Sequence, residues 1–266
     1  MKTSVWLVLC MACVLSVSAT AWAQVEGREV EYRSGSTLLK GYLAQETTVK
    51  GKRPAVLVVH EWWGHNEYAR KRARMLAELG YVALAVDMFG DGKVAQHPAD
   101  AGKFAAEAMK NKGVGEARFL AALEFIRRQP SVDPTRVAAL GYCFGGGVVL
   151  HMARQGADLR GVISYHGTLA TDTPAAPGRV KAKILVFNGE ADKMVPREQV
   201  AAFMKEMTAA GALYRYRGYP GVMHSFTNPD ADAFAIKFDL PLAYDRKADE
   251  DSWGESIKFL KEVFAK

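Results

Sequence analysis

The chain has 266 residues, 49% of them hydrophobic, and a formal net charge of +6. This length and apolar content suit one α/β domain of ordinary size. The lysines and arginines are scattered among acidic residues without a long basic run, so we interpret the charge as a solvated surface and expect no nucleic-acid partner.

The N-terminus has the features of an export signal. Lys2 gives a short positive start, residues 5–17 are apolar, and residues 21–23 (Ala-Trp-Ala) form a small-x-small cleavage site. The apolar run is too short for a membrane span. We therefore predict a signal peptide at 1–23 and one mature domain at 24–266, exported to the periplasm or secreted. The alternative is an uncleaved anchor.

Removal of the signal changes the charge and the thiol content. Lys2 is its one charged residue, so the mature charge is +6 − 1 = +5. Cys10 and Cys13 leave with it, and Cys143 then has no cysteine with which to form an internal disulfide. A lone thiol is a liability in an oxidising compartment, so its presence mildly favours a chemical use. We expect no membrane association after cleavage, and a monomer.

Strand and helix patterns alternate along the mature chain. Strands are predicted at residues 29–34, 38–44, 55–60, 81–86, 137–140, 161–166, 184–189 and 213–219, the first two as an antiparallel hairpin. Helices are predicted at about 67–79, 103–110, 115–128, 144–155, 197–210 and 248–265, and residues 220–246 as a loop. The alternation predicts a mostly parallel sheet of about eight strands covered by helices on both faces. Sites in such sheets lie beyond the carboxyl ends of the strands.

Residues 141–146 (Gly-Tyr-Cys-Phe-Gly-Gly) join a predicted strand to a predicted helix by a sharp turn with a thiol at its apex. The pattern Gly-x-nucleophile-x-Gly at such a turn predicts a nucleophile elbow. The helix dipole favours a thiolate at Cys143, and the N–H of Phe144 is placed to donate to an oxyanion. The alternative is a glycine-rich turn around a buried cysteine.

A thiol nucleophile needs a base and a group that orients the base. In the elbow fold the chain order is nucleophile, acid, histidine. Asp192 follows the strand at 184–189, with Glu190 as a competing acid, and His224 follows the strand at 213–219. The alternatives are a loop turn or helix cap for Asp192 and a structural role for His224.

The other histidines have weaker positions. His60 and His65 flank a loop beyond a predicted strand and could touch substrate. His151 lies inside a predicted helix, and His166 ends a strand with no partner indicated.

These motifs resemble those of the dienelactone hydrolase family of α/β-hydrolases. The resemblance covers about residues 28–264. It rests on residues 141–146, on 189–192 (Gly-Glu-Ala-Asp), on 221–226 (Gly-Val-Met-His-Ser-Phe) and on 59–64 (Val-His-Glu-Trp-Trp-Gly). It implies the α/β-hydrolase fold.

The resemblance also implies residue roles. Cys143, Asp192 and His224 would form the triad. A glutamate at the place of Glu61 contacts the resting thiol in this family and swings away when substrate binds. The residue after it, here Trp62, donates its backbone N–H to the oxyanion hole together with Phe144.

The resemblance does not extend to the residues that bind the substrate carboxylate. Family members that act on dienelactone carry two arginines for the substrate carboxylate, and this chain has Asp91 and Asn228 there. Lys93 could replace one of them, but lysine offers a point charge and not a bidentate fork. We therefore predict substrate contacts from Trp63, Phe89, Lys93 and Asn228, with apolar contact dominant.

Together these features predict an exported hydrolase that cleaves a carboxylic ester or lactone without a metal or organic cofactor. Two alternatives remain. One is an acyl or thioester transferase on the same triad, and the other is a binding protein on a hydrolase scaffold.

Overall fold

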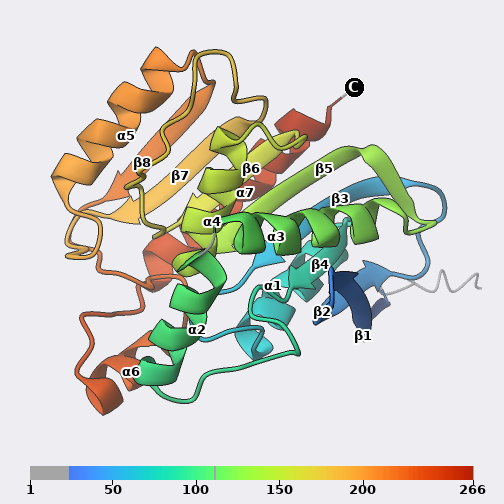
Figure 1. The fold of residues 1–266 in the computed structure, drawn as a ribbon, viewed down its shortest axis with the longest axis horizontal. Helices are drawn as coiled ribbons and strands as arrows, with labels where there is room; N and C mark the ends of the chain where they lie inside the picture. Colours follow the sequence, from blue (N-terminus) through green and yellow to red (C-terminus); the bar gives the residue numbers. More distant parts are fainter. Residues whose placement is uncertain (1–23, 111, 266) are drawn as a thin grey trace, which may run out of the picture.

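A single mixed sheet of eight strands organises the computed structural model, which describes residues 24–110 and 112–265 (Figure 1). The predicted signal peptide lies outside these residues. The strands are β1 Val25–Ser34, β2 Thr37–Glu46, β3 Arg53–Val59, β4 Val82–Val86, β5 Val132–Tyr142, β6 Gly161–Tyr165, β7 Lys183–Gly189 and β8 Tyr214–Tyr219. The helices are α1 Glu67–Glu78, α2 Pro98–Lys110, α3 Lys112–Arg127, α4 Phe144–Arg154, α5 Arg197–Ala209, α6 Ala231–Phe238 and α7 Arg246–Phe264.

The strand order is β1-β2-β4-β3-β5-β6-β7-β8. β1 and β2 form the predicted antiparallel hairpin, and every neighbouring pair from β4 to β8 is parallel. The carboxyl ends of the parallel strands therefore meet at one edge, where the predicted site residues follow β3, β5, β7 and β8. The prediction of an α/β sheet of about eight strands is confirmed.

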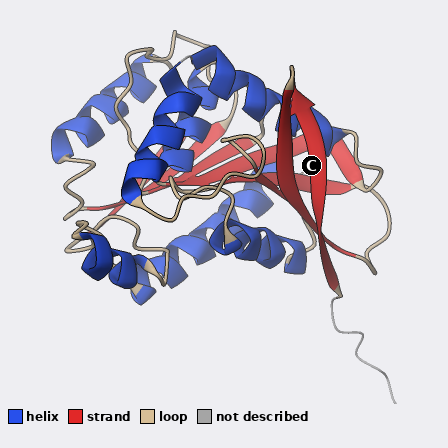
Figure 2. Cartoon of the chain, turned by 60° about the horizontal axis from the view of Figure 1, so that its bottom comes forward, coloured by secondary structure: helices blue, strands red, loops and turns tan. Residues whose placement is uncertain are grey.

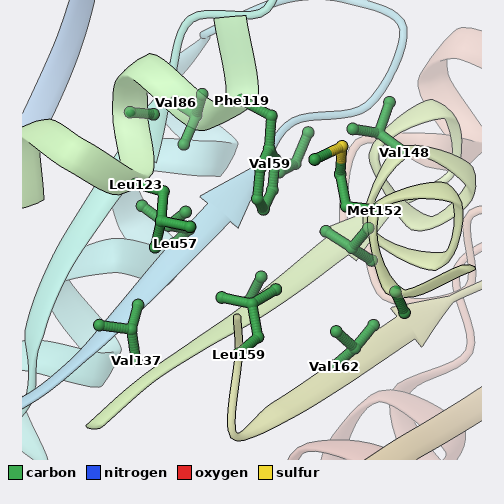
Figure 3. Packing of buried hydrophobic residues seen from close by; sticks show 14 of the residues in the cluster. Leu57, Val59, Val86, Phe119, Leu123, Val137, Val148, Met152, Leu159 and Val162 are labelled. Carbon is green, nitrogen blue, oxygen red and sulfur yellow. The ribbon is translucent and has the colours of Figure 1, made fainter. Parts of the chain in front are cut away.

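Helices cover both faces of the sheet, as Figure 2 shows. Successive residues of a strand point to opposite faces. Leu57 and Val59 accordingly belong to the core under α3, α4 and α5, whereas Val56 and Val58 belong to the core under α1 and α7. In Figure 3, Phe119 of α3 and Met152 of α4 pack over the first of these cores. This burial explains why the strands read as continuous apolar runs.

One prediction at the site end of the sheet is wrong. Residues 220–246 were expected to be a loop, but they contain helix α6. Its Phe234 and Phe238 pack on Trp63, with ring centroids 4.5 Å and 5.9 Å away. Phe104 of α2 joins the same cluster. A helix of two turns has little stability of its own, so these contacts between distant segments stabilise it.

Two boundaries differ by five residues. α2 begins at Pro98, five residues before the predicted start, because proline suits the first turn of a helix. β5 begins at Val132, ahead of the apolar run that predicted it. Among residues 24–110 and 112–265, no helix combines the length and apolar content needed to cross a membrane.

Candidate active site

Cys143 stands alone between β5 and α4, with backbone angles φ 51° and ψ −114°. Such a positive φ is uncommon for a residue with a side chain. The neighbouring glycines are required by close backbone contacts. A Cβ at Gly141 would lie 2.1 Å from the Gly145 oxygen, and one at Gly145 would lie 2.3 Å from the Val59 oxygen. The turn thus has the predicted elbow geometry.

Asp192 and His224 meet at the same edge of the sheet. His224 Nδ1 lies 2.7 Å from Asp192 Oδ2, and both side chains are buried. Glu190, the competing acid, has a side chain that is 41% exposed and lies 4.0 Å from Arg197. Asp192 is therefore the candidate acid that contacts His224.

His224 faces Cys143 across a shared cavity. Its Nε2 is buried and has no hydrogen-bond partner among the described residues. Burial alone would lower the pKa of His224. The Cys143 side chain, and then the hydrogen bond that His224 donates to Asp192, outweigh burial and raise the pKa of His224 to about 10. The arrangement favours the protonated ring of His224.

The cavity has a volume of about 250 Å³ and walls that are almost entirely apolar. Its lining residues are Trp62, Ala105, Cys143, Phe144, Thr168, Met194, Val195, His224 and Leu242. Ala105 comes from α2, and Leu242 from the segment after α6, so both helices shape the cavity. This lining contains no lysine, arginine, aspartate or glutamate.

Trp62 and Phe144, whose backbone N–H groups are the predicted oxyanion donors, line the cavity together with Cys143. Within the described residues neither donates to another backbone group. His60, buried behind the Trp62 loop, holds the Glu61 carbonyl with its Nδ1 at 2.5 Å and accepts from the Met88 N–H with its Nε2 at 3.3 Å. In a trans peptide the N–H points away from the C=O. His60 therefore fixes the direction of the Trp62 N–H.

Glu61 binds the loop that carries His224. Its Oε1 accepts from Ser225 Oγ at 3.0 Å, and its Oε2 from Asn228 Nδ2 at 2.6 Å. The side chain is 2% exposed. Burial raises its pKa, against the two donors and the nearby His224. Both oxygens are thus engaged by the histidine loop.

Comparison with known proteins identifies the family. The sequence model of the dienelactone hydrolase family matches residues 39–264. The chain belongs to the dienelactone hydrolase family.

Individual relatives extend over nearly the whole chain. An Aquifex aeolicus protein with a provisional carboxymethylenebutenolidase name is 28% identical, over 88% of this chain and 98% of its own. A Bradyrhizobium protein named provisionally as a 2-oxo-3-(5-oxofuran-2-ylidene)propanoate lactonase is 28% identical, over 83% of this chain and 88% of its own. Among solved structures, a dienelactone hydrolase-like promiscuous phosphotriesterase from metagenomic libraries is 34% identical, with a TM-score of 0.86 over 91% of this chain and 99% of that one. The chain is thus a dienelactone-hydrolase-family hydrolase with the α/β-hydrolase fold.

The four residues predicted to contact substrate are not among those that line this cavity. Trp63 and Phe89 are buried beside the cavity, and Asn228 is held by Glu61. Lys93 lies over the Phe104 ring, with its Nζ 5.8 Å from the ring centroid. Trp62, which was predicted as an oxyanion donor, is the tryptophan that lines the cavity.

His60 and His65, predicted as possible substrate contacts, are both buried away from the cavity. His151 lies in α4, as predicted, and its Nε2 is 2.7 Å from Glu116. Within 24–110 and 112–265, no group of three or more His, Cys, Asp or Glu side chains is placed to hold a metal ion.

Sequence reasoning missed His166. It directly follows β6 and its Nδ1 accepts a hydrogen bond from the Cys143 N–H at 3.1 Å. Its place just past a buried strand was the available signal, the same signal that selected Asp192. Thr168, two residues later, lines the cavity and was missed with it.

Proposed function

We propose that this hydrolase cleaves carboxylic esters or lactones with Cys143 as its nucleophile. One observation carries the proposal. Asp192 holds Nδ1 of His224 at 2.7 Å, while Nε2 stays unpaired toward the cavity that Cys143 also lines. This is the order of contacts that a nucleophile, a base and an orienting acid require.

The proposed reaction has two halves. The Cys143 thiolate attacks the carbonyl carbon, and the N–H groups of Trp62 and Phe144 stabilise the oxyanion. The C–O bond then breaks, the His224 imidazolium protonates the departing alkoxide, and a thioester remains on Cys143. His224, now neutral, removes a proton from water, which attacks the thioester and releases the acid. For a lactone, the leaving alkoxide stays attached to the acyl group.

The cavity supports a neutral substrate. Its volume of about 250 Å³ and its apolar lining suit a small ester or lactone. A carboxylate in this cavity would have to lose its hydration without a fixed cation opposite it. A carboxylate-bearing dienelactone is therefore a poor fit here.

Phosphotriester hydrolysis is a second candidate. It is favoured by the 34% identity to a promiscuous phosphotriesterase and by a cavity lining without lysine, arginine, aspartate or glutamate. A phosphotriester is neutral, and the same N–H groups that face a carbonyl oxygen would face its phosphoryl oxygen.

The decisive experiment combines turnover with trapping on the enzyme. We expect hydrolysis of short p-nitrophenyl esters and neutral lactones, with an acyl group on Cys143 detected by intact-protein mass spectrometry after rapid quenching. A parallel assay with a dialkyl p-nitrophenyl phosphate tests the second candidate. Transfer of the acyl group to an added alcohol, in place of water, would show that the enzyme is a transferase. Absence of both turnover and adduct would leave only a binding protein.

We further propose that the mature enzyme is an exported monomer. The support is the N-terminal pattern in residues 1–23 of the sequence. Cell fractionation and N-terminal sequencing test the export, and light scattering of the purified mature chain tests the oligomeric state.

A further inference from the structure

A second buried histidine stands behind the candidate triad. His166 has no solvent exposure and an unusual backbone φ of 39°. Its backbone N–H donates to the Phe187 oxygen at 2.7 Å, which fixes the residue at the end of β6. A bulky residue with positive φ is strained and persists where surrounding contacts determine it.

The hydrogen bonds of the His166 ring determine its tautomer. The Cys143 N–H donates both to the Tyr165 carbonyl oxygen at 3.0 Å and to Nδ1 of His166 at 3.1 Å, and because this N–H can only donate, Nδ1 must accept. Nε2 lies 2.8 Å from Thr227 Oγ1. A neutral ring with an unprotonated Nδ1 carries its hydrogen on Nε2. His166 therefore donates to the Thr227 hydroxyl.

The network beyond Thr227 is consistent with this direction. Thr227 Oγ1 lies 2.7 Å from the Tyr68 hydroxyl, which in turn lies 3.1 Å from the Thr227 carbonyl oxygen. Arg72 Nε lies 3.3 Å from the Tyr68 oxygen, and the Arg72 guanidinium pairs with Asp249 at 2.5 Å. Thr227 Oγ1 accepts from His166 and donates to the Tyr68 hydroxyl. The Tyr68 hydroxyl donates to the Thr227 carbonyl oxygen and also accepts from Arg72 Nε. Arg72, which can only donate, anchors the far end of the network.

The ring also stays neutral. Burial, then the positive charges of His224 and Arg72, hold the pKa of His166 well below its usual range. A neutral ring keeps Nδ1 available as an acceptor at any pH at which the fold persists. The groups that face it are His224, Arg72 and, through the hydroxyl network, Tyr68.

His166 touches both halves of the catalytic pair. Its ring centroid lies 5.1 Å from that of His224, edge to face, and 5.2 Å from that of Phe226. Thr227, its hydrogen-bond partner, is in the same loop as His224. One imidazole thus joins the backbone of the thiol to the loop of the base.

We propose that His166 is a positioning residue that aligns Cys143 with His224, by accepting from the Cys143 N–H and donating to Thr227. This rests on the proposed function, in which the two residues act together. His166 does not line the cavity, so it would act on the alignment of the pair and not on substrate binding. Misalignment of reacting groups by small distances costs about tenfold to a hundredfold in rate.

Two matched pairs of variants test the proposal. His166→Leu removes the acceptor and donor, whereas His166→Asn keeps a short acceptor and tolerates the positive φ. Thr227→Val removes the hydroxyl at nearly the same shape, and Thr227→Ser keeps it. We expect His166→Leu and Thr227→Val to lower kcat for a p-nitrophenyl ester, by about tenfold to a hundredfold for the first. We expect KM to stay within about twofold. Asn and Ser should recover much of the loss.

Alkylation of Cys143 by iodoacetamide across pH gives a readout that needs no ester turnover. The rate profile of His166→Leu should move to higher pH, since a displaced thiol loses the imidazolium that favours its thiolate. If wild-type protein proves not to be an esterase, this profile still reports on the alignment. If His166→Leu does not fold, the Thr227 pair decides.

The tautomer of His166 in the wild-type protein can be measured directly, so this test does not depend on how a variant behaves. In long-range ¹H–¹⁵N spectra of labelled protein, His166 should be neutral with its proton on Nε2; the His166→Asn spectrum serves for assignment. A proton on Nδ1 would overturn the proposal. So would unchanged kcat and alkylation profiles in both His166→Leu and Thr227→Val, which would make His166 a packing residue.

Discussion

The side-chain amide of Asn228 donates to the Glu61 carboxylate over 2.6 Å, with 167 positions of chain between the two residues. Ser225, which donates to the other carboxylate oxygen, has a φ of 59°. Glu61 therefore ties the loop after β3, which carries Trp62, to the loop that carries His224. In family members that act on dienelactone, an arginine is expected at the place of Asn228. Here an uncharged amide holds the carboxylate.

Glu61 is predicted to restrain the thiol through its charge. A nearby negative charge disfavours a thiolate. We expect Glu61→Gln, which keeps the shape, to make Cys143 react with iodoacetamide at lower pH and oxidise faster in peroxide. Ser225→Ala is the control, because it removes one hydrogen bond and keeps the charge. Identical profiles for Glu61→Gln and wild type would leave Glu61 with a structural role.

The ionisation of Glu61 also predicts a pH dependence of stability. Burial raises its native pKa above the ordinary value of 4.5, so the native state binds this proton more tightly than the unfolded state. The unfolding free energy contributed by Glu61 must then fall as pH rises from about 4.5 through the raised pKa. Urea unfolding of wild type and Glu61→Gln between about pH 4 and 8 should show the wild type losing stability relative to the variant as pH rises. A constant difference would contradict the raised pKa.

Cys143→Ala should abolish ester turnover, with kcat lower by about four orders of magnitude or more. The smaller side chain also suits the tight turn, so we expect the melting temperature to change little. The assay is p-nitrophenyl ester hydrolysis alongside circular dichroism. Activity that survives in this variant would refute the role of the thiol.

Asp192→Asn should lower kcat by about three to four orders of magnitude, because the amide no longer selects the correct His224 tautomer. His224→Ala should be at least as damaging. Glu190→Gln is the matched control in the same loop, since Glu190 faces Arg197 and solvent. A larger loss in Glu190→Gln than in Asp192→Asn would mean that the wrong acid has been chosen.

The cavity lining predicts a preference for neutral substrates. A lactone with a free carboxylate and its methyl ester form a matched pair for steady-state kinetics. We expect kcat/KM to be at least about tenfold higher for the methyl ester, since the lining has no lysine or arginine to offset the desolvation of the acid. A clear preference for the free acid would identify a recruited cation, with Lys93 the first to replace by methionine.

The chain by itself determined the sheet, the elbow and two members of the candidate triad, Cys143 and His224. Each of these leaves a local pattern. Buried parallel strands are continuous apolar runs, and parallel strands bring the residues that follow them to one edge. Cys143 and His224 could be chosen for that reason alone. The glycines beside Cys143 are likewise local, because the backbone of the turn leaves no room for a Cβ at either position.

Only the tertiary structure decided between Asp192 and Glu190, because both follow the same strand and only one faces His224. It also showed His166 behind Cys143 and helix α6 over Trp63. These contacts join segments that lie far apart in the chain. They depend on strand order and on the packing of helices against the sheet, and no periodicity within a single segment encodes either one.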